Sequence, residues 1–153
     1  MKPISHMRLR VTLLSGFAVM ATLPSLAPAR ATVTPKAGQY WGPSVLPGGQ
    51  VVPPGELGVS FRVLAGGTTI AAKAAPPTGR CGRPFVLKKI PIRNGSFNFI
   101  GTGIAVLHGK TTRVSVTWTG KWGSATSVSG TARYKTASCD SGLIRWSSKW
   151  RTP

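Results

Sequence analysis

The stretch GVSFRVLAGGTTIAAKA, from Gly58 to Ala74, decides the fold class. At its start, Val59, Phe61 and Val63 alternate with polar residues. Apolar residues at every second position lie on one face of an extended chain, so this alternation predicts a β-strand with one buried face. The Gly66-Gly67 pair that follows is typical of a tight hairpin turn. The stretch therefore predicts two neighbouring antiparallel strands.

Similar alternation continues along the chain, and no stretch after the N-terminal apolar run shows helical periodicity. Asn94-Gly95 is the strongest two-residue hairpin signal. The segment from Pro43 to Gly58 holds four prolines and four glycines, which predicts a long loop or an irregular sheet edge. The sequence thus predicts an all-β fold, an antiparallel sandwich or barrel of about eight short strands. The expected strands span residues 38–42, 59–63, 68–74, 85–93, 96–100, 104–107, 113–119 with a continuation to 124 after a bend at Gly120, 128–135 and 143–151.

The first residues, 1–31, are predicted to form a secretory signal peptide. They combine a basic start, an apolar run from Val11 to Leu26 and small residues in the stretch APARA, Ala27 to Ala31. The apolar run is short for a bilayer span, although an uncleaved anchor is the alternative. Cleavage would leave residues 32–153 as a single secreted β-domain without a transmembrane segment, located outside the cell or in the cell envelope.

The chain is strongly basic, with 20 Lys and Arg residues against two acidic residues and a formal net charge of +18. Such a surface attracts anionic polymers, so anionic envelope polymers or polysaccharides are the expected partners. The sequence shows no specific nucleic-acid-binding motif. Several cations occupy strand positions opposite apolar neighbours and are expected to point to solvent. The candidate polyanion-binding residues are Arg62, Arg133, Lys135, Arg145, Lys149 and Arg151.

The two cysteines, Cys81 and Cys139, are predicted to form a disulfide. Export places them in an oxidising compartment, and two cysteines allow a single pairing. A zinc site is not expected, because two cysteines, one histidine after the signal and two acids are a poor ligand set. We expect no metal and no cofactor.

Several short motifs are spread over the domain after the signal. They are Gly-x-Tyr-x-Gly at 38–42, VSFRV at 59–63, the loop cysteine at 81, Ile-x-x-Gly-x-Phe at 92–97, Ser-Gly-Thr at 129–131 and Cys-Asp-Ser-Gly-x-x-x-Trp at 139–146. In these motifs the chain resembles a group of small secreted bacterial all-β domains, mostly uncharacterised. The resemblance implies a disulfide-stapled β-fold and no particular activity. This chain departs from the group in its high positive charge and its long Pro/Gly segment.

The segment Cys139-Asp140-Ser141-Gly142 is similar to the nucleophile segment of trypsin-like serine proteases. A serine triad also needs a histidine and a carboxylate that orients it. After the signal the chain offers His108 and Glu56, and no motif places either beside Ser141. We interpret the segment as a turn after the disulfide, in which Asp140 binds backbone amides. No catalytic residue is predicted, although a serine–lysine dyad stays open.

The tryptophans divide into core and surface candidates. Alternation places Trp118, Trp122, Trp146 and Trp150 with the inward residues, which predicts positions in the core. Trp41 and Trp150, near the ends of the domain, are the candidate aromatic-binding residues. The predicted function is therefore that of a secreted cationic β-domain, not an enzyme, that binds anionic polymers. The alternatives are a carbohydrate-binding module that uses exposed tryptophan and a small hydrolase with an unrecognised dyad.

Overall fold

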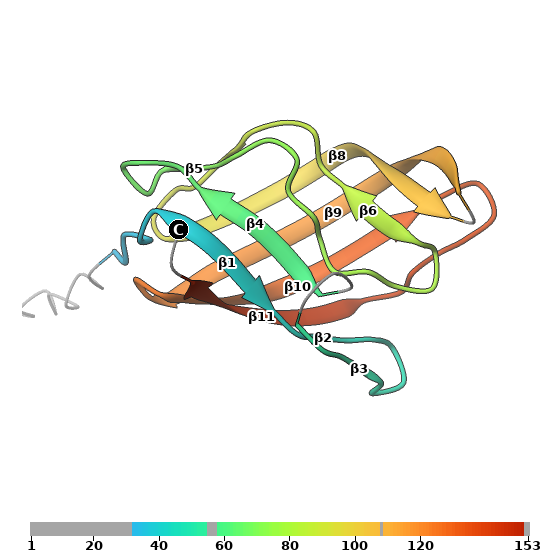
Figure 1. Cartoon of the computed structure of the whole chain (residues 1–153), viewed down its shortest axis with the longest axis horizontal. Coiled ribbons are helices and arrows are strands. Elements are labelled where there is room, and N and C mark those ends of the chain that lie inside the picture. The colour runs from blue at the N-terminus through green and yellow to red at the C-terminus, as the bar shows by residue number, and fades with distance from the viewer. Residues whose placement is uncertain (1–31, 55–57, 108, 152–153) are drawn as a thin grey trace, which may run out of the picture. The chain divides into compact units, whose positions relative to one another are not determined.

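The computed structural model describes residues 32–54, 58–107 and 109–151, and all regular structure in these ranges is β-strand (Figure 1). The predicted signal peptide, 1–31, and the triad candidates Glu56 and His108 lie outside the described residues. No helix in these ranges has the length and apolarity to cross a membrane. The strands are β1 (Gly38–Gly42), β2 (Ser44–Val45), β3 (Val51–Val52), β4 (Val59–Val63), β5 (Thr69–Ile70), β6 (Arg83–Phe85), β7 (Ile90–Pro91), β8 (Ser96–Leu107), β9 (Lys110–Ser124), β10 (Ser127–Lys135) and β11 (Ile144–Arg151).

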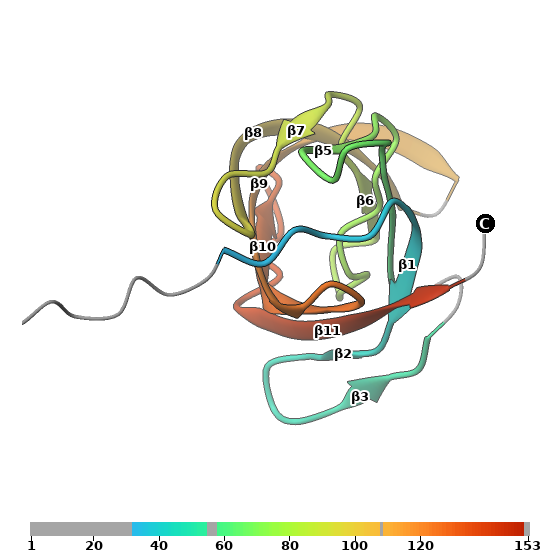
Figure 2. The ribbon, with the colours of Figure 1, turned by 90° about the vertical axis from the view of Figure 1, so that its left-hand side faces the viewer.

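These strands form one antiparallel sheet that curls around a single core (Figure 2). The order across the sheet is β6-β8-β9-β10-β11-β1-β4-β5-β7, with the β2–β3 hairpin attached to β11. Isolated bridges between Ser60 and Ala75 and between Ala74 and Val86 link β4 to the chain that follows β6. The sheet is thus a half-barrel joined across its open side by two bridges. The prediction of an all-β antiparallel fold with a Cys81–Cys139 disulfide is confirmed.

Glycines do not break the long strands, although the sequence predicted a break between residues 100 and 104. β8 runs through Gly101 and Gly103, and β9 continues through Gly120 to Ser124, as predicted. A Cβ atom on Gly103 would lie 2.5 Å from the carbonyl oxygen of Phe85 on β6. A Cβ on Gly120 would overlap the ring of Phe97. These glycines therefore make room for close neighbours, and the predicted strands 96–100 and 104–107 are one strand.

The hairpin at Asn94-Gly95 is confirmed, because both residues have positive φ and Arg93 pairs with Ser96 on either side of the turn. The predicted single strand 85–93 is wrong. In the register of this hairpin Pro91 would lie opposite Asn98, and proline has no N–H to donate to the ladder. The residues before the hairpin therefore do not pair with β8, and β7 pairs with β5 instead.

The Pro/Gly segment forms an irregular edge with two short strands. β2 continues the register of β1 along β11, since Tyr40 pairs with Trp150 and Ser44 with Trp146. Pro43 stands between the two strands. On the side away from β11, β1 pairs with β4, whereas β2 pairs with β3. The edge therefore bends away from the curled sheet at Pro43.

The inward face of the sheet carries a large aromatic cluster. Trp118, Trp122 and Trp146 are 0%, 2% and 3% exposed, which confirms their predicted place in the core. They pack with three further aromatic residues, Tyr40, Phe61 and Phe97, at ring-centroid distances between 5.0 and 6.3 Å. Because this core fills the interior, any binding site has to lie on the outer surface.

Candidate functional site

The outer surface of β11, β1 and β4 gathers most of the predicted binding residues. Trp41 points outward from β1 and is 46% exposed. It pairs with Lys149 of β11 on one side and with Ser60 of β4 on the other. Two positions along β1, Gln39 pairs with Arg151 and with Arg62. We call the surface formed by Gln39, Trp41, Arg62, Lys149 and Arg151 the Trp41 face.

Alternation explains why these side chains share one surface. In β11 the residues at even positions, such as Trp146 and Ser148, are buried, so Lys149 and Arg151 point to solvent. In β4 Arg62 is exposed between two buried neighbours in the same way. Paired residues on one face of antiparallel strands have Cβ atoms about 5 Å apart, which places Lys149 beside the Trp41 ring.

A groove of about 270 Å³ opens beside Trp41, where β1 ends and the β3–β4 connection begins. The Ser147 carbonyl oxygen fills the place that a Gly42 Cβ would take, and Pro43 turns the chain aside next to the groove. We call it the Trp41 groove. Its lining residues are Trp41, Gly42, Pro43, Pro54, Ser147, Ser148, Lys149 and Arg151.

Ser148 borders the groove, but it pairs with Val128 and its side chain faces the core side of the sheet. Ser148 is 2% exposed, and its Oγ has no hydrogen-bond partner among the described residues. A buried hydroxyl without a partner costs free energy, so such groups are uncommon in native proteins. Nearby, Gln39 Nε2 donates to Ser60 Oγ at 3.0 Å, which holds the Gln39 side chain across β1 and β4.

The cations of the Trp41 face make no ion pair with any described residue. Asp140, the only acid that the structure describes, is bound elsewhere by Arg133 and Lys135. Lys149 and Arg151 therefore present their charges to solvent. Their charge is available to an external anion, whereas that of Arg133 and Lys135 is partly neutralised.

Arg133 and Lys135, predicted as polyanion-binding residues, lie apart from the Trp41 face on β10. Arg133 Nε donates to Asp140 Oδ1 at 3.0 Å, and Lys135 Nζ lies 3.1 Å from Oδ2. The Arg133 guanidinium and the Gly142 N–H hold the pKa of the Asp140 carboxyl well below its usual range. Arg133 and Lys135 therefore form a local ion cluster with Asp140 at the β10–β11 turn.

Arg145 and Trp150 also lie away from the face. Arg145 is exposed on β11, but it pairs with Val45 of β2, beyond the bend of the edge. Trp150 is half-buried against the core, and its Nε1 donates to the Ala37 carbonyl at 2.9 Å. The Lys36 ammonium lies 3.6 Å from the centre of a Trp150 ring. The segment 32–37, which crosses one end of the curled sheet, thus engages Trp150 within the fold (Figure 2).

Ser141 is held in the interior by hydrogen bonds. It is 1% exposed, its Oγ accepts from the Tyr134 N–H at 2.9 Å, and it donates to the Gly142 carbonyl at 2.8 Å. The predicted turn role of Asp140 is confirmed, because Oδ1 accepts from the Gly142 N–H at 2.9 Å. Both hydroxyl functions of Ser141 are therefore used within the fold.

We expect Ser141→Ala to lower the free energy of unfolding by about 1–3 kcal/mol, because the Tyr134 N–H would lose its acceptor in a buried place. Thermal denaturation of the variant measures this loss. Ser138→Ala, at an exposed serine of the same turn, is the control and should melt with the parent protein. Equal melting temperatures for Ser141→Ala and the parent would contradict this role.

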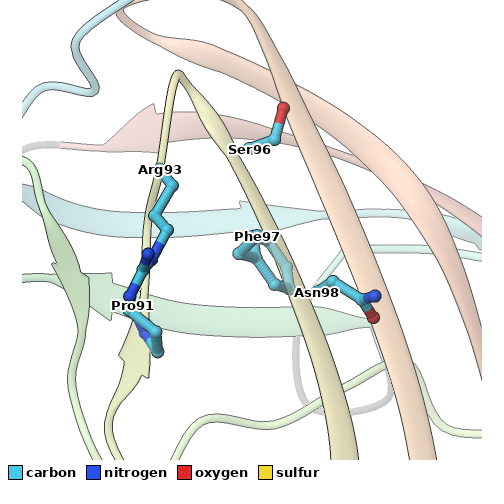
Figure 3. A pocket seen from close by; sticks show the side chains of 5 residues that line it. All are labelled: Pro91, Arg93, Ser96, Phe97 and Asn98. Carbon is cyan, nitrogen blue, oxygen red and sulfur yellow. The ribbon is translucent and has the colours of Figure 1, made fainter.

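A second groove lies between Pro91 of β7 and the start of β8 (Figure 3). It has a volume of about 310 Å³ and is lined by Pro91, Arg93, Ser96, Phe97 and Asn98. Arg93 is its one cation, and its aromatic residue, Phe97, is only 4% exposed. No predicted binding residue lies in it, so the Trp41 groove is the stronger candidate.

No family model, curated protein or solved structure matches this chain. Among the described residues, no three His, Cys, Asp or Glu side chains come together in a way that could hold a metal ion. The chemistry of the Trp41 face is therefore the basis for assigning a function.

Proposed function

We propose that this protein is a secreted, cationic and non-catalytic β-domain that binds anionic polymers of the cell envelope or the extracellular space through the Trp41 face. The observation that carries the proposal is the gathering of Arg62, Lys149 and Arg151 on one outward face, without an ion pair to any described residue. A surface with one sign of charge concentrates polymers of the opposite sign.

A polymer suits this face better than a single small anion. One exposed ion pair contributes about 0.5 kcal/mol, which is too little for useful affinity by itself. Anionic groups repeated along a chain can contact several cations at once, and later contacts then form at high effective concentration. The cations lie on three neighbouring strands, so one polymer chain can cross all of them.

Support for a binding role over hydrolysis comes from Ser141. The serine that resembles a protease nucleophile is buried, and its hydroxyl is bound to the backbone of β10 and of Gly142. A nucleophile needs a base within hydrogen-bond reach and access to the substrate. We therefore favour binding, with neutral carbohydrate binding by exposed Trp41 as the second candidate.

We expect a variant without the three cations of the face to bind inorganic polyphosphate about tenfold more weakly than the parent protein at low salt, since three exposed contacts are lost. The face variant combines Arg62→Gln, Lys149→Gln and Arg151→Gln. The control variant loses the same charge at exposed lysines outside β1, β4 and β11, by Lys88→Gln, Lys89→Gln and Lys110→Gln. The measurement is the dissociation constant at several salt concentrations.

The comparison of the two variants decides the proposal. If the face is the site, the control variant binds nearly as well as the parent, and binding by the parent falls steeply as salt screens the charges. Equal weakening of both variants would mean that only net charge matters. Binding that ignores salt would instead favour the second candidate, because stacking is not screened.

A further inference from the structure

We infer that the Trp41 groove recognises a single sugar ring that carries an anionic substituent, so that the polymer bound is an acidic polysaccharide. The inference rests on the proposed function and names the ligand class for the same face. Its basis is the placement of an exposed aromatic ring beside cations that make no ion pair with any described residue, at a groove of about the size of one ring. None of these three features alone would distinguish a sugar from other anions.

The first feature is the exposed Trp41 ring. The flat face of an exposed indole ring suits a ligand ring with apolar C–H groups. Trp41 is 46% exposed at the groove, while the other ring of this end of the sheet, Trp150, is covered by Lys36. An inorganic polyanion has no apolar face with which to use this surface.

The second feature is the position of the cations relative to the ring. Lys149 lies directly across from Trp41, and Arg151 follows it on the same outward face of β11. A sugar ring stacked on Trp41 would therefore present one edge to these two side chains. A carboxylate, sulfate or phosphate on that edge would meet a positive charge, and the guanidinium can bind such a group through two N–H donors.

The third feature is the size of the groove. The volume of about 270 Å³ lies just below the usual range for pockets that enclose a drug-sized ligand. It is suited to one ring of a polymer, and the neighbouring units would extend over the cations of the Trp41 face.

The test compares three probes on the parent protein, on Trp41→Ala and on the ring-retaining variant Trp41→Phe. The probes are an oligogalacturonate, a neutral xylo-oligosaccharide and inorganic polyphosphate, each titrated calorimetrically at low salt. We expect Trp41→Ala to bind the oligogalacturonate about tenfold more weakly (about 1.4 kcal/mol), while Trp41→Phe keeps most of the affinity. Polyphosphate binding should change less than twofold in both variants. Trp41 points outward, so both variants should keep the parent's melting temperature.

The inference and the proposed function fail in different ways. If Trp41→Ala binds the oligogalacturonate as tightly as the parent while the face variant still loses polyphosphate binding, the sugar inference is overturned and the polyanion proposal stands. If the xylo-oligosaccharide binds as tightly as the oligogalacturonate, the anionic substituent plays no part, which also overturns the inference. If neither anionic probe binds the parent, the proposed function itself is wrong.

Discussion

Trp146→Ala should remove roughly 3–5 kcal/mol from the free energy of unfolding and strongly destabilise the domain. Trp146 is 3% exposed, and its ring centre lies within 5.9 to 6.1 Å of the rings of Phe61, Phe97 and Trp118. Truncation would leave a cavity in the middle of this cluster. A domain of this size has only about 5–15 kcal/mol of stability, so the loss would take between roughly a fifth and the whole of it.

The Trp146 indole N–H has no hydrogen-bond partner among the described residues, and the same is true of Trp118 and Trp122. Several rings in the cluster meet edge to face, such as Phe61 and Trp146 at an interplanar angle of 82°. In such arrangements the ring edge meets the electron-rich face of its neighbour, which stabilises the pair. Trp146 therefore contributes through packing, and Trp146→Phe should be far less destabilising than Trp146→Ala.

Denaturation by urea measures both variants, with Trp41→Ala as the control because Trp41 is the exposed tryptophan of the sheet. The control should lose no more than about 1 kcal/mol, since most surface substitutions change stability little. If Trp146→Ala and Trp41→Ala unfold at the same urea concentration, Trp146 does not pack in the core as described.

Side-chain direction along the strands could be predicted from the sequence because alternation is a local property. The bounds of β1 and β4 match the predicted strands 38–42 and 59–63. The residues Val128, Ala132 and Tyr134 of β10 are buried, as alternation indicates. Each assignment depends only on neighbours in the same strand.

Interactions between distant segments could not be predicted in this way. Trp41 and Lys149 lie side by side because of the register between β1 and β11, which are far apart in sequence. Similarly, the Ser141 hydroxyl binds the Tyr134 N–H on β10, whereas a local bond in the turn was expected. Register depends on the whole sheet, so no short motif reveals either contact.

Removal of the Cys81–Cys139 disulfide should lower the free energy of unfolding by about 4 kcal/mol, because the bond closes a long loop in the unfolded chain. The sequence separation of the two cysteines is 58 residues. The double variant Cys81→Ala/Cys139→Ala tests this value by urea denaturation. Reductant should bring the parent protein to the stability of the double variant and leave the double variant unchanged. Two alkylatable thiols in the parent protein purified without reductant would refute the bond.

Removal of the disulfide should first increase local opening beside the open side of the half-barrel. Cys81 lies in the short turn between Gly79 and Gly82, which is otherwise tied to β10 by the hydrogen bond from the Tyr134 hydroxyl to the Gly82 carbonyl at 2.8 Å. Beyond this turn, the isolated bridge between Ala74 and Val86 helps to join the sheet across its open side. Backbone pairing is sparse here, so the disulfide holds this region in place where a continuous hydrogen-bond ladder is missing. Amide exchange in residues 74–86 should therefore rise on reduction before exchange in β9 and β10 does.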